Sequence, residues 1–250
     1  MFDNTMWDGS SGMVDRPRAS ERRAAGKGPR TSLTLDAIID RACQLLDSEG
    51  LEALTLRRLA GELGVGAASV YWYVDGKDEL IELCFNATLE QVVTDLLGRR
   101  FEAASWKADL RTMFSDLFDL LTRHQWVAQL MSSQQSRGRL VMLVWDRVGV
   151  LLGSLGLSVE ESFYAGSALM GHLGAMSVVS ASQRGSGTDP DTDREVRLQR
   201  IAADMAALDP QEFPGISLSI PVLLRHTERE QFLGGLDLIL DGIASRLTSA

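Results

Sequence analysis

The sequence has little of what several protein classes require. Its 250 residues include 2 cysteines and 6 prolines, and aromatic residues make up 6%. So few cysteines exclude a disulfide-rich scaffold and favour a reducing compartment, so we expect a cytoplasmic protein. No apolar run approaches the ~20 residues that span a bilayer, and the first residues lack the apolar segment of a signal peptide. We therefore expect no membrane partner.

Sequence motifs of common enzyme classes are also missing. There is no GxSxG, Walker or HExxH pattern. Residues 64–69 (GVGAAS) lack the third glycine of a dinucleotide fingerprint. The three histidines and two cysteines are scattered and form no pair at ligand spacing. We therefore expect no enzyme, no cofactor and no metal site.

Positive charge is in short supply, because 25 Lys and Arg face 34 Asp and Glu, a net charge of -9. That balance ordinarily argues against a nucleic-acid partner. The charge is unevenly distributed, however. Residues 16–30 carry six basic side chains and one acidic, a local +5, whereas residues 31–80 carry four basic and nine acidic, a local -5. A basic arm therefore precedes an acidic domain.

Apolar residues recur at helical spacing through most of the chain, and strand patterns are nearly absent. A first helix is predicted between the N-cap Thr34 and Gly50, and another begins near Asp75, with Asp78 at the capping-box position. The spacing also predicts helices over 55–63 and 67–74, capping boxes at Ser158 with Glu161, Thr192 with Glu195 and Thr227 with Glu230, and loops over 183–194 and 214–224.

The predicted fold class is all-α, with three parts. Residues 1–30 are a flexible basic arm, residues 31–80 a three-helix domain, and residues 81–250 a larger helical domain. The three-helix domain has the layout of a helix-turn-helix, whose second paired helix enters the major groove of DNA. Tyr71, Trp72 and Tyr73 are consecutive and point about 100° apart, so at least one ring must be exposed. The alternative is that this helix pair is merely a corner of a core.

The stretch from Leu33 to Leu80 contains LLDSEGLEALTLRRLA, then LGVGAASVYWYV, then a polar pair and a lysine before the next apolar helix. It resembles the DNA-binding domain of the TetR family of bacterial transcriptional repressors. The resemblance implies a homodimer that binds a palindromic operator and releases it when a small, largely apolar inducer binds the C-terminal domain. The alternative is a helical small-molecule-binding protein with a degenerate helix-turn-helix and no operator.

The resemblance also implies which residues contact DNA. Family members often have His in place of Tyr73, and tetracycline repressors have Gln-Pro in place of Ala67-Ala68, so the operator sequence does not carry over. We expect the basic arm to follow a minor groove, the alternative being a solvated tail. The acidic residues Asp36, Asp40, Asp47, Glu49 and Glu62 are expected to face away from the phosphates. The expected DNA-binding residues are Arg57, Arg58, Ala67, Ala68, Ser69, Tyr71, Trp72, Tyr73 and Lys77, with Arg16, Arg18, Arg22, Arg23 and Arg30 in the arm.

Two later patterns favour self-association, the alternative being packing within one chain. A heptad-like seam on the last helix and small residues repeating every four positions give the expected dimer-interface residues Leu233, Leu236, Leu240, Ile243 and Leu247, with Ser167, Gly171 and Ala175.

Large apolar side chains between the two ends of the chain form a candidate ligand pocket, the alternative for each being core filling. The family's tetracycline–magnesium site uses histidine and amide side chains that have no match here, so we do not expect tetracycline. The candidate pocket residues are Phe114, Phe118, Trp126, Met131, Met142, Trp145, Phe163, Met170, His172 and Met176.

Overall fold

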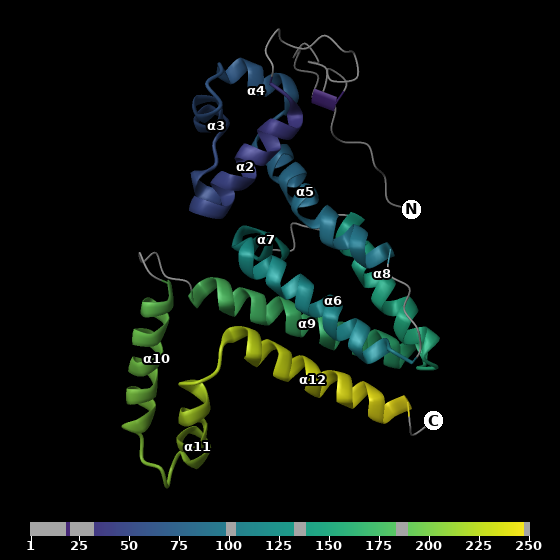
Figure 1. The fold of residues 1–250 in the computed structure, drawn as a ribbon, viewed down its shortest axis with the longest axis vertical. Coiled ribbons are helices and arrows are strands. Elements are labelled where there is room, and N and C mark those ends of the chain that lie inside the picture. The colour runs from purple at the N-terminus through teal and green to yellow at the C-terminus, as the bar shows by residue number, and fades with distance from the viewer. Residues whose placement is uncertain (1–18, 21–32, 99–103, 133–138, 184–189, 248–250) are drawn as a thin grey trace, which may run out of the picture.

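The computed structural model describes residues 19–20, 33–98, 104–132, 139–183 and 190–247 (Figure 1). Within these ranges every regular element is a helix and no strand occurs, which confirms the all-α expectation. No helix in the same ranges is both long and apolar enough to cross a bilayer. Arg16, Arg18, Arg22, Arg23 and Arg30 of the basic arm lie outside the described residues.

The N-terminal unit consists of α2 (Leu35–Glu49), the 3-10 turn η1 (Leu51–Ala53), α3 (Leu56–Glu62) and α4 (Ala67–Tyr73). The predicted cap at Thr34 is confirmed, because its hydroxyl accepts a hydrogen bond from the Ala37 amide at 3.1 Å. The predicted end at Gly50 is confirmed too, since this residue has φ +79°, which favours glycine. Local sequence signals therefore fix both ends of α2.

Helix α5 (Lys77–Gly98) leads out of this unit and packs beside α8 (Figure 1). It is continuous, so the expected domain boundary after residue 80 falls inside a helix. The predicted capping contact differs as well. The Asp75 amide donates to the Glu79 carboxylate at 2.5 Å, so Glu79 takes the role expected of Asp78.

The larger unit is built around α9 (Val159–Gln183), which packs against α6 (Trp106–Arg123), α7 (Gln125–Ser132), α8 (Arg139–Ser154) and α12 (Glu228–Leu247). Figure 1 shows α6 and α12 lying along α9. Exposed ion pairs join α12 to α6, among them Arg111 to Asp237 at 2.7 Å and Arg229 to Asp119 at 2.9 Å. Exposed pairs contribute little stability, and α12 is held on the body mainly by Phe232, Leu236 and Leu240, which are fully buried in the core.

Helices α10 (Pro190–Ala206) and α11 (Pro214–Leu223) form a hairpin beside that body (Figure 1). Residues 214–223 are thus helical, which corrects the predicted loop there. Of the other predicted loop, residues 190–194 are helical as well, and residues 184–189 lie outside the described residues. Pro214 occupies the first turn of α11, where its missing N–H costs nothing, and only Pro221 interrupts the helix. The capping boxes at Ser158 and Thr227 are confirmed by reciprocal bonds, whereas Thr192 lies inside α10.

The heptad-like seam of α12 faces the chain's own core. Leu236 and Leu240 are fully buried and Ile243 is 7% exposed in a single chain. They pack with the helices around α9, so no second copy can reach them, and Leu233 and Leu247 are half-buried beside them. For Leu236, Leu240 and Ile243 the expectation of a contact between two subunits was wrong, because intramolecular packing uses the same 3–4 spacing. For Leu233 and Leu247 it stays a prediction. Leu238, two positions from both Leu236 and Leu240, is 76% exposed.

Candidate nucleic-acid interface and ligand cavity

A tight glycine turn sets α4 across the end of α3. Gly64 has φ +67°, a conformation that other residues rarely adopt, and the Val65 amide donates to the Ala60 carbonyl at 2.9 Å. Val70 and Val74 are fully buried and anchor α4 in the core. The turn and these two anchors determine which face of α4 points outward.

The outward face of α4 carries Ala68 and Tyr71, with Ser69 and Trp72 half-buried beside them. Tyr71 is 43% exposed, as expected of at least one ring in the aromatic triplet. The prediction that Tyr73 contacts DNA was wrong. It is 9% exposed and its hydroxyl donates to the Leu33 carbonyl at 2.5 Å, so its ring belongs to the core and does not face a groove.

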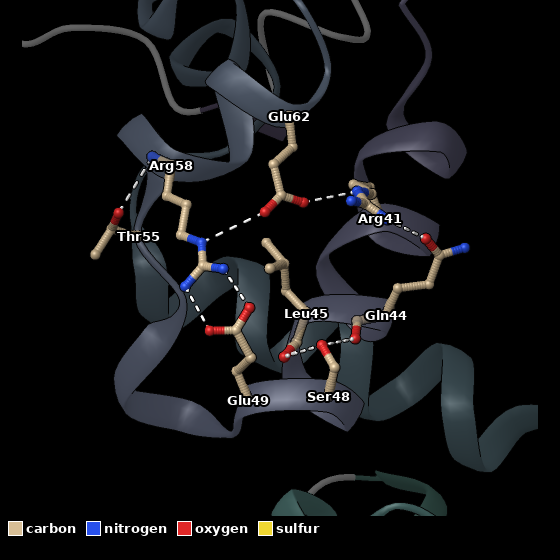
Figure 2. A network of polar contacts seen from close by, with 8 residues as sticks. All are labelled: Arg41, Gln44, Leu45, Ser48, Glu49, Thr55, Arg58 and Glu62. Atoms are coloured by element: carbon tan, nitrogen blue, oxygen red, sulfur yellow. Dashed lines mark hydrogen bonds and ion pairs between the residues drawn. The ribbon is translucent and has the colours of Figure 1, made fainter.

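The cations expected to bind phosphates are placed unequally. Arg57 is exposed at the start of α3, whereas Arg58 points back to α2. Figure 2 shows the Arg58 guanidinium paired with both carboxylate oxygens of Glu49 and reaching Glu62, whose other oxygen lies 2.7 Å from Arg41. Arg58 therefore holds α3 against α2, and the expectation that it clamps a phosphate was wrong.

Two further contacts involve residues that follow α4 in the chain, Asp75 and Lys77. The Lys77 ammonium donates to the Leu51 carbonyl at 2.8 Å, which leaves two of its three N–H donors for other acceptors. The Ala19 amide donates to both oxygens of the Asp75 carboxylate, at 2.9 and 3.0 Å. This contact brings one point of the N-terminal arm next to the junction between α4 and α5.

The remaining acidic side chain of interest, Asp47 on α2, faces the larger unit. One of its carboxylate oxygens lies 2.7 Å from His124 Nδ1 and 2.8 Å from Trp126 Nε1. The Trp126 ring is 1% exposed, so this indole N–H is paired in the interior. The sequence pattern predicts Trp126 as a pocket residue and does not indicate this contact, because no local pattern links residues so far apart in the chain.

A cavity of about 740 Å³ lies between α7, α8 and α9. This volume falls within the range of small-molecule sites. The cavity opens to solvent along α9, where Gly171 and Ala175 are exposed. Its lining is mostly apolar and comprises Leu121, Ala128, Met131, Val141, Met142, Trp145, Ser167, Met170, Gly171, Gly174, Ala175, Ser177 and Val178.

The structure divides the expected pocket residues into three groups. Four of them, Met131, Met142, Trp145 and Met170, line the cavity. His172 does not: its ring stacks on Phe232 and its Nε2 lies 2.9 Å from the Phe232 carbonyl, so it joins α9 to α12. The other five are away from the cavity lining: Phe114, Phe118 and Trp126 are buried in the core, Met176 packs against it, and Phe163 is 63% exposed.

The three small residues expected to let helices of two subunits approach, Ser167, Gly171 and Ala175, line the same cavity. Their small side chains leave room on α9 for the cavity, and their expected contact with a second subunit stays a prediction.

The two cysteines, which look isolated in the sequence, meet between α2 and α5. Cys43 Sγ lies 4.0 Å from the Cys84 carbonyl oxygen, and Cys84 Sγ lies 3.8 Å from the Ile39 carbonyl oxygen. A hydrogen bond from the Cys84 thiol lowers the pKa of Cys43, while the same contact and burial raise the pKa of Cys84. No group of three or more metal-ligating side chains occurs in the described part of the chain.

Comparison with known proteins matches two family models to this chain. Residues 38–84 match the family described as bacterial regulatory proteins, tetR family, and residues 101–247 match the tetracyclin repressor-like C-terminal domain. The HTH-type transcriptional repressor DrrR1 of Streptomyces coeruleorubidus is 30% identical over 223 residues, which cover 88% of this chain and 81% of that protein.

Solved structures agree with the sequence matches. A TetR transcriptional regulator from Streptomyces coelicolor superposes with a TM-score of 0.71 at 28% identity, covering 85% of this chain and 98% of that one. ActR of Streptomyces coelicolor in complex with actinorhodin gives a TM-score of 0.69 at 28% identity, covering 86% of this chain and 97% of that one. With both its helix-turn-helix and its C-terminal domain matched, the chain belongs to the TetR family of bacterial regulatory proteins.

Proposed function

We propose that the protein is a homodimeric repressor that binds a palindromic operator and releases it when a small, largely apolar molecule enters the 740 Å³ cavity. A regulator of this kind works in the cytoplasm on chromosomal DNA. The observation that carries the proposal is that an outward-facing α4 and an apolar cavity share one chain, with a direct polar contact between the two units.

The outward face of α4 suits a DNA major groove. Ala68 is small enough to let the helix backbone approach base edges, and Tyr71 presents a ring with a hydroxyl tip that suits phosphate oxygens and thymine methyls. Arg57 lies on the adjoining helix as a phosphate contact. The acidic surplus of the domain is compatible with this role, because Glu49 and Glu62 are paired with arginines and Asp47 faces the larger unit.

The cavity supports a ligand-responsive mechanism. ActR, a relative with the same fold, has been solved with actinorhodin bound. A ligand in the cavity of this chain would contact α7 through Ala128 and Met131. The same short helix carries Trp126, which bonds to Asp47 of the N-terminal unit. A ligand that displaces α7 therefore acts on α2 through a single helix.

A smaller void adds a second connection. It is about 20 Å³ in volume, shares Met131 and Met170 with the cavity, and is bounded by Leu89 and Val93 of α5. The side chains of Met131 and Met170 therefore lie between the cavity and α5, the helix that follows α4 in the chain. If the ligand prefers the state that does not bind DNA by ~100-fold, the coupling is about 2.7 kcal/mol.

Reading a palindrome requires two copies of α4 about 34–36 Å apart, which a dimer provides. We place the dimer contact on the exposed strip of α12 around Leu238, with Phe163 of α9, which is 63% exposed. Leu238→Glu should dissociate the dimer without unfolding the chain, as sedimentation and circular dichroism would show. Leu240→Glu should unfold it, because that side chain is fully buried. A dimer that survives Leu238→Glu would place the interface elsewhere.

The DNA-binding part is tested with DNA flanking the protein's own gene, by gel shift at low salt. Tyr71→Ala and Arg57→Ala should each weaken binding roughly tenfold, about 1.4 kcal/mol, and Arg57→Ala should reduce the salt dependence. Arg200→Ala, an exposed arginine on α10, is the matched control and should have no effect. Absence of binding by the unaltered protein would favour the alternative of a ligand-binding protein without an operator.

A further inference from the structure

The two cysteines of the chain form one thiol pair between α2 and α5. Cys43 Sγ lies 4.0 Å from the carbonyl oxygen of Cys84 itself. Cys84 Sγ lies 3.8 Å from the carbonyl oxygen of Ile39, one helical turn before Cys43. Each sulfur therefore lies against the backbone that carries the other, and the two thiols share a hydrogen bond. A small movement is enough to join such a pair by a disulfide bond of about 2 Å.

The two thiols differ in exposure and acidity. Cys43 is half-buried, whereas Cys84 is fully buried. The hydrogen bond from Cys84 lowers the pKa of the Cys43 thiol, and it outweighs burial and two nearby carboxylates, which raise it. The same contact and burial raise the pKa of Cys84. Cys43 is therefore the thiol that reacts first as a thiolate, and Cys84 is the second thiol beside it.

A small polar molecule has a route to Cys43. The sulfur of Cys43 lies 3.9 Å from Thr88 Oγ1, and Thr88 lines a cavity of about 340 Å³ between α5 and α6. Asp95 and Arg123 line the same cavity and are exposed, so the cavity reaches the surface. A water molecule occupies roughly 30 Å³ in the liquid, so hydrogen peroxide, which is only slightly larger, fits easily.

We propose that Cys43 and Cys84 form a reversible oxidation site, at which a peroxide converts the two thiols into a disulfide between α2 and α5. The Cys43 thiolate attacks one oxygen of hydrogen peroxide, the O–O bond breaks, and the hydroxide that leaves takes up a proton to become water. Cys84 then attacks the sulfur of the sulfenic acid formed on Cys43. The S–O bond breaks, and the thiol proton of Cys84 leaves with the hydroxide as a second water. Two thiols and one peroxide thus give one disulfide and two waters.

The disulfide acts on the DNA-binding unit, and this part of the inference rests on the proposed function. Two contacts hold the ends of α2 to the elements around it. At one end, the Tyr73 hydroxyl of α4 donates to the Leu33 carbonyl. At the other end, the Lys77 ammonium of α5 donates to the Leu51 carbonyl. An S–S bond is shorter than the contact between two hydrogen-bonded thiols, so it draws α2 toward α5 between these contacts. The resulting change in the position of α4 lowers the affinity for DNA.

The test oxidises the full-length protein with hydrogen peroxide. Free thiols are then counted by alkylation of the denatured chain and mass spectrometry. They should fall from two to none, with no covalent dimer on a non-reducing gel, and dithiothreitol should restore both. Because the chain has only these two cysteines, an intramolecular disulfide can join no other pair. If both thiols survive conditions that oxidise free cysteine, or if the disulfide links two chains, the site is refuted.

Two serine variants separate the roles of the thiols. Cys84→Ser should stop Cys43 at the sulfenic acid, which dimedone traps. In Cys43→Ser, the buried Cys84 thiol should stay reduced. Equal behaviour of the two variants would overturn the assignment of Cys43 as the attacking thiol. The thiol count of the unaltered protein needs no variant, so it decides the oxidation site even if a variant fails to fold.

The effect on DNA is measured by gel shift with DNA flanking the protein's own gene. Oxidised protein should bind at least roughly fivefold more weakly than reduced protein. Dithiothreitol should restore the affinity, because it reduces a disulfide but not a methionine sulfoxide. Cys43→Ser treated with peroxide in the same way is the matched control and should keep its affinity.

The possible failures are distinguishable. An unchanged affinity of the oxidised protein refutes the link to DNA binding while the thiol result stands. If the reduced protein binds no DNA, the proposed function fails, and the thiol count still decides whether the oxidation site exists.

Discussion

Replacing Asp47 by alanine should loosen the contact between the two units of the chain. Asp47 lies on α2, and one carboxylate oxygen is within hydrogen-bonding distance of both His124 and Trp126. The substitution removes the acceptor from both rings at once. Because Trp126 is 1% exposed, its indole N–H would be left in the interior without its partner.

The magnitude follows from these two contacts. A buried donor that loses its partner costs about 1–3 kcal/mol. The His124 contact adds little, roughly 0–1 kcal/mol, because the side chains of His124 and Asp47 keep 21% and 33% of their exposure. We therefore expect Asp47→Ala to lower the free energy of unfolding by about 2 kcal/mol. For a chain of this size that corresponds to a fall in the unfolding midpoint of roughly 4–8 °C.

The assay is thermal unfolding of the Asp47→Ala, Trp126→Phe and double variants, with Asp40→Ala as the matched control because Asp40 is an exposed acid on the same helix. The double variant should be more stable than the sum of the two single effects predicts, since both remove the same bond. If Asp47→Ala behaves like Asp40→Ala, or if the two single effects simply add, the contact carries no energy and our account of the interface is wrong.

Three other substitutions have defined outcomes. The hydrogen bond and charge of Arg58 lower the pKa of Glu49, so this pair contributes stability above about pH 4.5 and loses it as the pH falls through the lowered value. Urea unfolding against pH should therefore show a shallower acid limb for Glu49→Gln, and an unchanged limb would contradict the pairing. A Cβ on Gly235 would lie 2.5 Å from the His172 ring, which is held by stacking and a hydrogen bond, so Gly235→Ala should destabilise the protein by roughly 1–3 kcal/mol. Gly149→Ala, where a Cβ meets nothing within 4 Å, should stabilise it slightly, and equal effects at the two sites would refute the packing argument.

Local signals in the sequence were sufficient for the N-terminal unit. The cap at Thr34, the stop at Gly50 and the glycine turn before α4 each depend on neighbours within a few residues, and the structure has all three. The exposure of Tyr71 followed from helix geometry alone. Periodicity, however, shows only that a residue faces something apolar. The leucines of α12 have the spacing of a dimer seam and pack instead inside their own chain.

Contacts between distant segments were beyond the sequence. Arg58 looks like a phosphate clamp until its partner Glu49 is known, and Trp126 looks like a pocket residue until Asp47 is placed beside it. The buried hydroxyl of Ser177 has no hydrogen-bond partner among the described residues, and no sequence pattern indicates this, because only the packing around the side chain shows it. The contacts and burial of these side chains depend on how the helices pack together, and residue spacing in the sequence does not predict that packing.

The uninterrupted course of α5 has a mechanical consequence. Its 22 residues form a rod of about 33 Å, with the DNA-binding unit at one end and the body of the larger unit along the rest. On a lever of that length, a swing of about 5° carries the far end through about 3 Å. Two such levers turning in opposite senses would change the spacing of a pair by about 6 Å, against the 34–36 Å between successive major grooves. A small rotation of α5 where it packs on the larger unit is thus enough to move the two α4 helices out of register with successive major grooves.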